Sequence, residues 1–177
     1  ITSNPAIDVA TSVPQVLAGP KLRCRAPRVD PGGGGINVAR AIHKLGGRAI
    51  ALVATGGTMG DRLLSLLAAA GGASLPVTVQ AETRQSFAVT DESTGEQFRF
   101  SVPGDPLTKA EGDALLRLIA EAAPVGGYAV YSGGVAPGLP VDFVEKVNAA
   151  VTQKGTRLVV DVSGPALHHL LKHPVRL

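Results

Sequence analysis

The protein has 177 residues, enough for one domain with a sizeable apolar core; 45% are apolar but only 3% aromatic, so we expect a core of Ala, Val, Leu and Ile. The net charge is +3 at pH 7 and the cations are dispersed, which argues against a nucleic-acid partner. No apolar run reaches the roughly 18–20 residues of a membrane span, and the single Cys24 excludes an internal disulfide and fits a reducing cytosol.

Hydrophobic periodicity predicts strands that alternate with helices along most of the chain. The predicted strands are residues 7–13, 22–29, 50–54, 86–90, 97–102, 128–132 and 157–162, with a brief apolar segment at 76–79. The predicted helices are one after the glycine run at 32–35 and others at about 61–70, from Thr108 onward, at 141–154 and at 163–172. Thr108 and Glu111 form a capping box, and Ser163 with Pro165 opens the last helix. Strands separated by helices favour a parallel α/β sheet.

Two stretches do not fit a parallel core. In residues 7–29 and 86–102 apolar and polar residues alternate, and residues 91–95 join two short strands as a hairpin loop. We expect these stretches to form a separate, small, half-exposed antiparallel sheet. One of its faces is formed by Phe87, Val89, Phe98, Phe100 and Val102.

The glycine run at 32–35 leads directly into a helix whose apolar stripe includes Val38, Ile42 and Leu45. Glycines before a helix N-terminus offer free N–H groups and the positive end of the helix dipole to a polar ligand. The run fails the Walker pattern, because no Lys-Ser/Thr pair follows it, and fails the dinucleotide pattern, because its third glycine is absent. The alternative is a tight turn whose glycines serve geometry alone.

Several segments together resemble the PfkB (ribokinase-like) carbohydrate kinases. They are GGGGINVARAI followed by LGG, NPAID at 4–8, KLRC at 21–24, TRQ at 83–85 and GEQFRF at 95–100. The resemblance extends over essentially the whole chain, with the segments in matching order and spacing. It implies a kinase that uses ATP and Mg²⁺ and phosphorylates the 1-hydroxyl of fructose 6-phosphate in the cytoplasm.

The resemblance also implies an architecture. We expect a doubly wound αβα core with a small antiparallel β lid over the sugar site, and a homodimer formed through the lids. Residues 1–177 would then be the N-terminal part of a single kinase domain. A first core strand is expected largely before Ile1, and a C-terminal part with the family's GAGD motif after Leu177. Since the Asp of that motif is the family's catalytic base, this chain alone is predicted to be inactive.

The resemblance assigns roles to residues at the sugar site. Asp8 would accept hydrogen bonds from two sugar hydroxyls, whereas without the resemblance an isolated aspartate here would first be interpreted as a turn residue that bonds its own backbone. Gly33 and Gly34 would contact the sugar through backbone N–H groups, and Asn37 through its amide. Arg84 is the candidate for a bidentate clamp on the 6-phosphate.

Four further positions carry weaker assignments. Lys21 and Arg23 would bind phosphate, one of them in the site of the neighbouring subunit; the alternative, which we prefer for Arg25, is that these cations protect an edge strand. Gly134 stands where, by the resemblance, close relatives carry a serine (SGS-x-P-P-G); a hydroxyl that could donate to the substrate is lost, although the backbone N–H of Gly134 remains to bind it. Asp161 could help to organise Mg²⁺ through water, or the segment around it could cap the next helix.

Other functions remain open at this point. Fructose-1-phosphate kinase and tagatose-6-phosphate kinase have similar N-terminal patterns. A non-catalytic sugar-phosphate-binding module would use the same site residues without the base. A dinucleotide-dependent oxidoreductase is disfavoured because the glycine pattern does not match.

Overall fold

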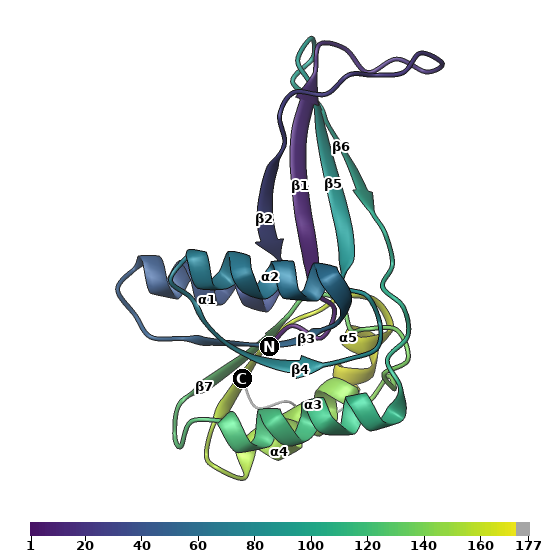
Figure 1. The fold of residues 1–177 in the computed structure, drawn as a ribbon. Helices are drawn as coiled ribbons and strands as arrows, with labels where there is room; N and C mark the ends of the chain where they lie inside the picture. Colours follow the sequence, from purple (N-terminus) through teal and green to yellow (C-terminus); the bar gives the residue numbers. More distant parts are fainter. Residues whose placement is uncertain (173–177) are drawn as a thin grey trace.

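A computed structural model describes residues 1–172 and shows a layered α/β core from which a four-stranded sheet projects (Figure 1). In chain order the elements are β1 (Ala6–Val13), β2 (Arg28–Gly32), α1 (Gly34–Lys44), β3 (Ile50–Thr55), α2 (Gly57–Ala69), β4 (Ala73–Thr78), β5 (Arg84–Asp91), β6 (Gln97–Ser101), α3 (Lys109–Ala122), β7 (Tyr128–Ser132), α4 (Phe143–Thr152), β8 (Arg157–Asp161) and α5 (Gly164–Leu170). Strands and helices therefore alternate as predicted, apart from the strands of the projecting sheet.

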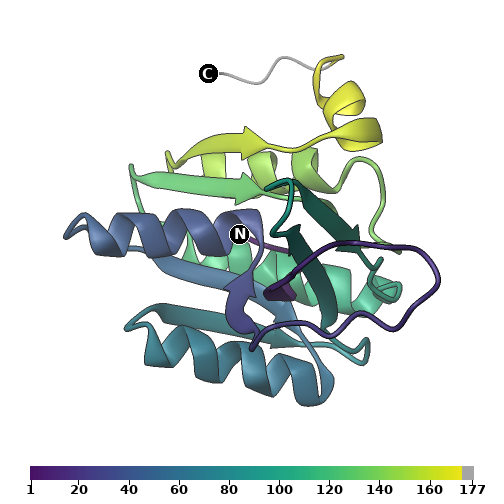
Figure 2. The ribbon, with the colours of Figure 1, turned by 90° about the horizontal axis from the view of Figure 1, so that it is seen from above.

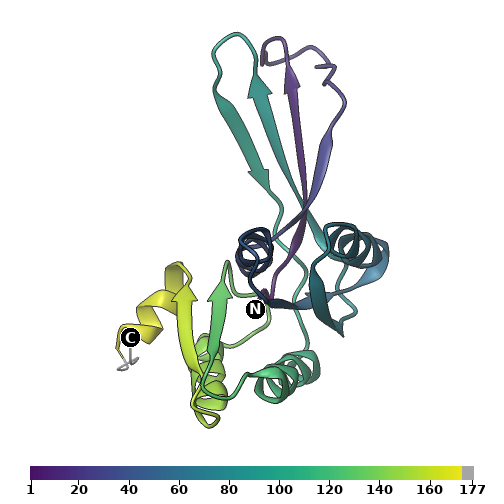
Figure 3. The same ribbon diagram turned by 90° about the vertical axis from the view of Figure 1, so that its left-hand side faces the viewer.

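The core contains two parallel strand pairs, β3 with β4 and β7 with β8. The first residues of the chain run between these pairs (Figure 2). Thr2 donates its N–H to the Leu52 carbonyl of β3 (2.9 Å), and the amino group of Ile1 donates to the Val130 carbonyl of β7 (2.6 Å). α1 and α2 lie on the side of the projecting sheet, whereas α3 and α4 lie on the opposite side (Figures 1 and 3).

Of the core strands, β3 is largely buried on both faces, as a strand of a parallel sheet between helix layers is, whereas β8 alternates exposed and half-buried residues, with Val159 48% exposed. In β3, Val53 packs with Ile36 and Leu63 under α1 and α2. The next residue, Ala54, belongs to a second cluster with Leu115 of α3. Because neighbouring side chains point to opposite faces, β3 packs against both helix layers and holds them together. Each fully buried Leu or Ile contributes about 1.5–3 kcal/mol to this arrangement.

The projecting sheet, which we call the lid, has the strand order β2-β1-β5-β6. The prediction that a separate small sheet forms from these stretches is confirmed. Purely antiparallel pairing is wrong, however, because β1 and β5 pair in parallel, while β1–β2 and β5–β6 pair antiparallel. Since β1 and β5 both leave the core in the same direction, only parallel pairing is open to them (Figure 1).

The predicted strand at 22–29 is wrong, because residues 21–27 form an irregular loop and β2 starts only at its end. Pro20 and Pro27 flank the loop; neither has an N–H to donate, and each restricts the residue before it. The loop is tied to β1 at one point, where Arg25 donates its N–H to Ser12 (2.9 Å) and its carbonyl accepts from the Thr11 hydroxyl (2.8 Å). The alternation of cations in this stretch therefore does not reflect a pleated strand.

The two faces of the lid differ in chemistry, because side chains alternate along each strand. Phe87 lies opposite Phe100 and Val89 opposite Phe98, so the predicted apolar face is confirmed for these four residues, while Val102 follows the end of β6. We call this the apolar face and the other the polar face. One row of the polar face crosses all four strands and consists of Asp30, Asp8, Ser86 and Ser101.

The helix ends follow local chemistry. The capping box of Thr108 and Glu111 is confirmed at the start of α3. Leu45, predicted for the apolar stripe of α1, is the C-cap residue and is 88% exposed. α2 begins before the expected residue 61, because the Glu82 carboxylate accepts the N–H of Met59 (2.7 Å) in the first helical turn.

Within the described residues, no helix has the length and apolar character needed to cross a membrane.

Candidate functional site

The glycine turn between β2 and α1 is a crowded junction. A Cβ on Gly32 would collide with the Asp8 carboxylate, and one on Gly34 with the Ser132 hydroxyl. Gly33 has a φ of 127°, which residues with side chains rarely adopt. The geometry of the tight turn therefore requires glycine at these positions. Its consequence is that β1, the end of β7 and the N-terminus of α1 meet at one point.

Asp8 lies half-buried beside this junction. Burial raises the pKa of its carboxyl above the ordinary value, and the charges of Arg84 and Arg99 act in the opposite direction. Among residues 1–172 no hydrogen bond to this carboxylate is found, so both oxygens can accept from a ligand. The alternative of a turn aspartate does not hold, because Asp8 lies inside β1.

The lid register places cations on both sides of the Asp8 row. Toward the core Arg84 is the partner of Ala6, and toward the tip of the lid Arg99 is the partner of Ala88. Both register partners are alanines, whose side chains are short, and the row of Asp8 lies between the two arginines in the register. A carboxylate that accepts hydroxyls, flanked by cations that attract an anion, suits a ligand with both kinds of group.

Arg84 is engaged at the root of the lid. Its Nη1 donates to Ser101 Oγ (3.0 Å), Ser86 Oγ (3.2 Å) and the Val102 carbonyl (3.2 Å), and both Nε and Nη2 reach the Asn4 carbonyl at 3.4 Å. Since a guanidinium carries five N–H groups, one Nη2–H remains without an acceptor. A bidentate contact from Arg84 to a phosphate therefore requires release of the Asn4 carbonyl, its longest contact.

Arg99 was not singled out by the sequence analysis. Its charge acts on Asp8, and within residues 1–172 no hydrogen bond or ion pair holds its guanidinium. The signal that could have identified it is the order Phe98-Arg99-Phe100, because a residue between two members of the apolar face lies on the polar face. Which row it joins could not be read from the sequence, since that depends on the β5–β6 register.

Asn37 and Gly134 lie on either side of the junction. Asn37 is in the first turn of α1, where its N–H bonds to the Gly33 carbonyl (2.9 Å) and its side chain is exposed. The approach of Gly34 to Ser132 joins this turn to the loop that follows β7 and carries Gly134. Gly134 is exposed, and a Cβ there would meet nothing within 4 Å.

Lys21 and Arg23 are not brought to Asp8 within this chain. Both are exposed on the loop between β1 and β2, which projects at the end of the lid far from the core (Figure 1). Neither is among the charges that act on Asp8. Arg25, for which we preferred a protective role, forms an exposed ion pair with Glu92 (3.1 Å).

Asp161 lies at the end of β8, where its carboxylate accepts a hydrogen bond from the Ser132 hydroxyl (2.7 Å). Helix capping is not seen, since the N-cap of α5 is Ser163 and its side chain makes no capping bond. Across residues 1–172 no group of three His, Cys, Asp or Glu side chains could hold a metal ion. Because Mg²⁺ in kinases often uses one or two carboxylates, water and nucleotide phosphates, Asp161 fits only as part of a site that the nucleotide completes.

This chain matches the family described as pfkB family carbohydrate kinase over residues 2–175, and it belongs to that family. It is 43% identical over 170 residues to ATP-dependent 6-phosphofructokinase isozyme 2 of Mycobacterium tuberculosis H37Rv, covering 96% of this chain and 50% of that protein. Identity to the isozyme 2 of Escherichia coli K12 is 44% over 170 residues, covering 94% and 54%.

The crystal structure of E. coli phosphofructokinase-2 in complex with fructose-6-phosphate is similar in fold, with a TM-score of 0.91 and 42% identity, covering 97% of this chain and 56% of that one. The predicted ribokinase-like αβα core with a β lid is therefore confirmed. The chain spans about half the length of the curated relatives that it matches.

Proposed function

We propose that the whole protein is an ATP-dependent 6-phosphofructokinase, which transfers the γ-phosphoryl group of MgATP to the 1-hydroxyl of fructose 6-phosphate in glycolysis. The named activities of its relatives support this reaction. The observation that carries it is the polar face of the lid, where the Asp8 carboxylate lies between the charges of Arg84 and Arg99. We also propose a cytoplasmic location, with which the unpaired, exposed Cys24 agrees.

The sugar hydroxyls are recognised around the glycine turn. In this proposal Asp8 accepts hydrogen bonds from two of them with its free oxygens. Gly33 and Gly34 donate backbone N–H groups at the N-terminus of α1, where the helix dipole is positive. The Asn37 amide, which is exposed in the first turn, both donates and accepts.

The 6-phosphate is held by guanidinium groups of the polar face. Arg99 has its donors available, and Arg84 contributes its charge and the Nη2 edge. Lys21 and Arg23 cannot reach Asp8 in their own chain without a large movement of the loop. We therefore retain the proposal that one of them serves the site of a partner subunit.

Phosphoryl transfer requires positioning, charge neutralisation and a base for the attacking hydroxyl. We propose that ATP and Mg²⁺ bind at the carboxyl edge of the core sheet, with Asp161 orienting water on the ion. The base is assigned by the family resemblance to the Asp of the GAGD motif, outside residues 1–177. The residues of this chain bind and orient the sugar phosphate.

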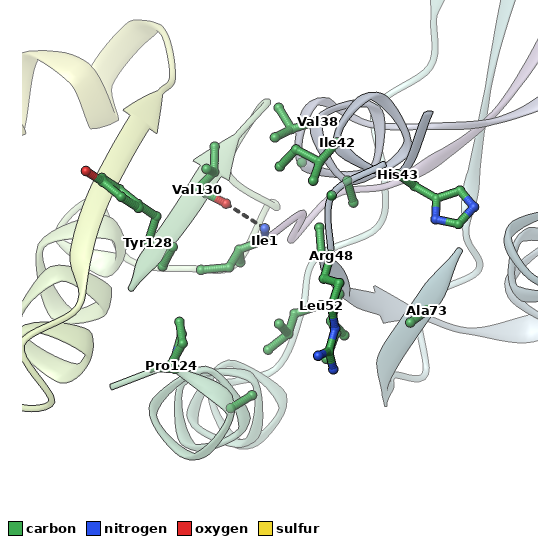
Figure 4. A pocket seen from close by; sticks show the side chains of 18 of the residues that line it. Ile1, Val38, Ile42, His43, Arg48, Leu52, Ala73, Pro124, Tyr128 and Val130 are labelled. Carbon is green, nitrogen blue, oxygen red and sulfur yellow. Dashed lines mark hydrogen bonds between the residues drawn. The ribbon is translucent and has the colours of Figure 1, made fainter. Parts of the chain in front are cut away.

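We propose that residues 1–177 are the N-terminal part of one kinase domain. A cavity of about 730 Å³, lined mainly by apolar side chains, lies between β3 and β7 (Figure 4). It is separate from the polar face of the lid. Ile1 and Thr2 pair with β7 and β3 at the end of this cavity. A first core strand that runs into Ile1, as the resemblance implies, would fill it and join the two strand pairs into one sheet.

A panel of sugar phosphates assayed with MgATP on the whole protein tests the proposed reaction. We expect kcat/KM for fructose 6-phosphate to exceed that for fructose 1-phosphate and tagatose 6-phosphate by at least about tenfold. A preference for either competitor would assign the protein to the corresponding alternative kinase. Sugar-phosphate binding without turnover would indicate the non-catalytic binding module.

The chain of residues 1–177 alone is expected to show no turnover, because the proposed base lies outside it. The measurement is ATP-dependent formation of fructose 1,6-bisphosphate, compared with a mock preparation. Turnover above that background would contradict the placement of the base.

Gly134→Ser is expected to fold normally and to lower KM for fructose 6-phosphate by about three- to tenfold. The space around Gly134 is open and its φ is not positive, so a serine fits, and its hydroxyl adds one hydrogen bond worth about 1 kcal/mol. Gly138→Ser is the matched control. Gly138 has a φ of 81° and abuts the Leu107 backbone, so this variant should lose stability. An unchanged KM for Gly134→Ser would place Gly134 outside the sugar site.

We propose a homodimer formed through the apolar face of the lid. Phe87 and Phe98 are each 38% exposed and Phe100 56%, and a sheet of this size cannot bury them itself. Phe100→Glu should therefore sediment as a monomer, and should bind the sugar phosphate more weakly if Lys21 or Arg23 acts across the interface. Gln97→Glu, on the polar face of the same strand, should remain a dimer. Wild-type protein that sediments as a monomer at micromolar concentration would contradict the dimer.

A further inference from the structure

A pair of serines on facing strands holds the Arg84 guanidinium. Ser86 of β5 and Ser101 of β6 are register partners on the polar face of the lid. Both hydroxyls accept hydrogen bonds from Arg84 Nη1, at 3.2 Å for Ser86 and 3.0 Å for Ser101. Ser86 is also the register partner of Asp8 on β1, so the pair lies in the same row as the carboxylate.

The arrangement restricts a side chain that is otherwise mobile. An arginine has many rotamers and loses up to about 2 kcal/mol of conformational free energy when it is fixed. With Nη1 held by the serines, the positive charge of Arg84 stays close enough to Asp8 to act on it. The cost of fixing the guanidinium is then met in the free protein and not when an anion binds, which is how preorganisation raises affinity.

We propose that Ser86 and Ser101 are positioning residues, which orient Arg84 for the phosphate group of the substrate. This rests on the proposed function, because it takes Arg84 to be part of a sugar-phosphate site. The competing explanation is that the two hydroxyls only fasten β5 to β6 through Arg84. Fastening would affect the stability of the lid and would leave the affinities for the two substrates equally changed.

The test uses Ser86→Ala and Ser101→Ala, singly and combined, in the whole protein. The double variant should raise KM for fructose 6-phosphate by about tenfold and leave KM for ATP and kcat within about twofold. Ser101→Thr keeps the hydroxyl on an exposed strand residue and should restore the wild-type KM. Thr90→Ala, on the same face of β5 beyond the reach of Arg84, is the matched control and should have no effect.

The same substitutions in an Arg84→Ala background separate the possible explanations. If the serines act through Arg84, they should change KM by less than about twofold in that background. An equal increase of KM in both backgrounds would overturn the proposal, because the serines would then act independently of Arg84. If Arg84→Ala raises KM and the serine variants do not, the positioning role is wrong while the phosphate site stands. If Arg84→Ala itself leaves KM unchanged, the proposed phosphate site fails first.

Discussion

Asp8→Asn in the whole protein is expected to lower kcat/KM for fructose 6-phosphate by about 10²- to 10⁴-fold. A hydrogen bond to a charged acceptor contributes about 1.5–3 kcal/mol, and the carboxylate is proposed to accept two of them. The measurement is steady-state kinetics at saturating ATP. Asp30→Asn is the matched control in the same row of the lid, because the Asp30 carboxylate is already paired with Arg28 (2.7 Å) and Arg40 (3.4 Å). A loss of similar size in both variants would mean that the substitutions disturb the whole row, and it would contradict a specific role of Asp8 in binding the sugar.

The same substitution should stabilise the fold at neutral pH. Burial raises the pKa of Asp8 in the folded state above that in the unfolded chain. The folded protein then binds the proton more tightly, so stability is lost as pH rises from the unfolded pKa to the folded pKa, and the penalty is complete above both. Asn carries no charge and avoids this penalty, so its melting temperature should be higher at pH 7, with the difference vanishing in acid. A lower melting temperature at pH 7 would show that the charge of Asp8 stabilises the lid.

Arg84→Ala should act mainly on the sugar phosphate. Loss of a charge-assisted contact worth roughly 2–4 kcal/mol corresponds to about a 30- to 1000-fold decrease in kcat/KM for fructose 6-phosphate. KM for ATP should change far less. Because Arg84 also bonds Asn4, Ser101 and Val102 at the lid root, its melting curve has to be recorded alongside. Equal effects on both substrates would remove Arg84 from the phosphate site.

The core could be predicted from sequence wherever the signals are local. β7 is found at the predicted residues 128–132, because a short apolar run is bounded by Gly127 and Gly133. The capping box at Thr108 is as local a signal, since both partners lie within one helical turn. Pairing between segments that are distant in the sequence could not be predicted from such local signals. Nothing in the alternation of β1 and β5 states that they run parallel, because that depends on how both leave the core.

The strand predicted at 22–29 shows how a periodic pattern can mislead. Lys21, Arg23 and Arg25 alternate with smaller residues, but two prolines bound the stretch and only one backbone hydrogen bond ties it to β1. Exposed cations on a solvated loop can alternate with other residues along the sequence in the same way as residues on one face of a pleated strand. The roles predicted for Lys21 and Arg23 therefore remain predictions about a second subunit.

Motifs in the sequence indicate the residues of the proposed sugar-binding part of the candidate site, but only some of those of the proposed phosphate-binding part. The glycine turn and Asp8 were indicated by motifs, and the structure brings them into contact. Arg84 was also indicated by a motif, but its five contacts at the lid root were not. Arg99 becomes visible only when the register of β5 and β6 is known, because the sequence shows its face and not its neighbours.

A crystal structure of the whole protein with fructose 6-phosphate tests the central claim most directly. The account predicts that the sugar lies against the polar face of the lid, with hydroxyls within hydrogen-bonding distance of Asp8 and the phosphate in contact with the guanidinium groups of Arg84 and Arg99. A sugar phosphate bound elsewhere, with Asp8 and both arginines free of it, would contradict the account.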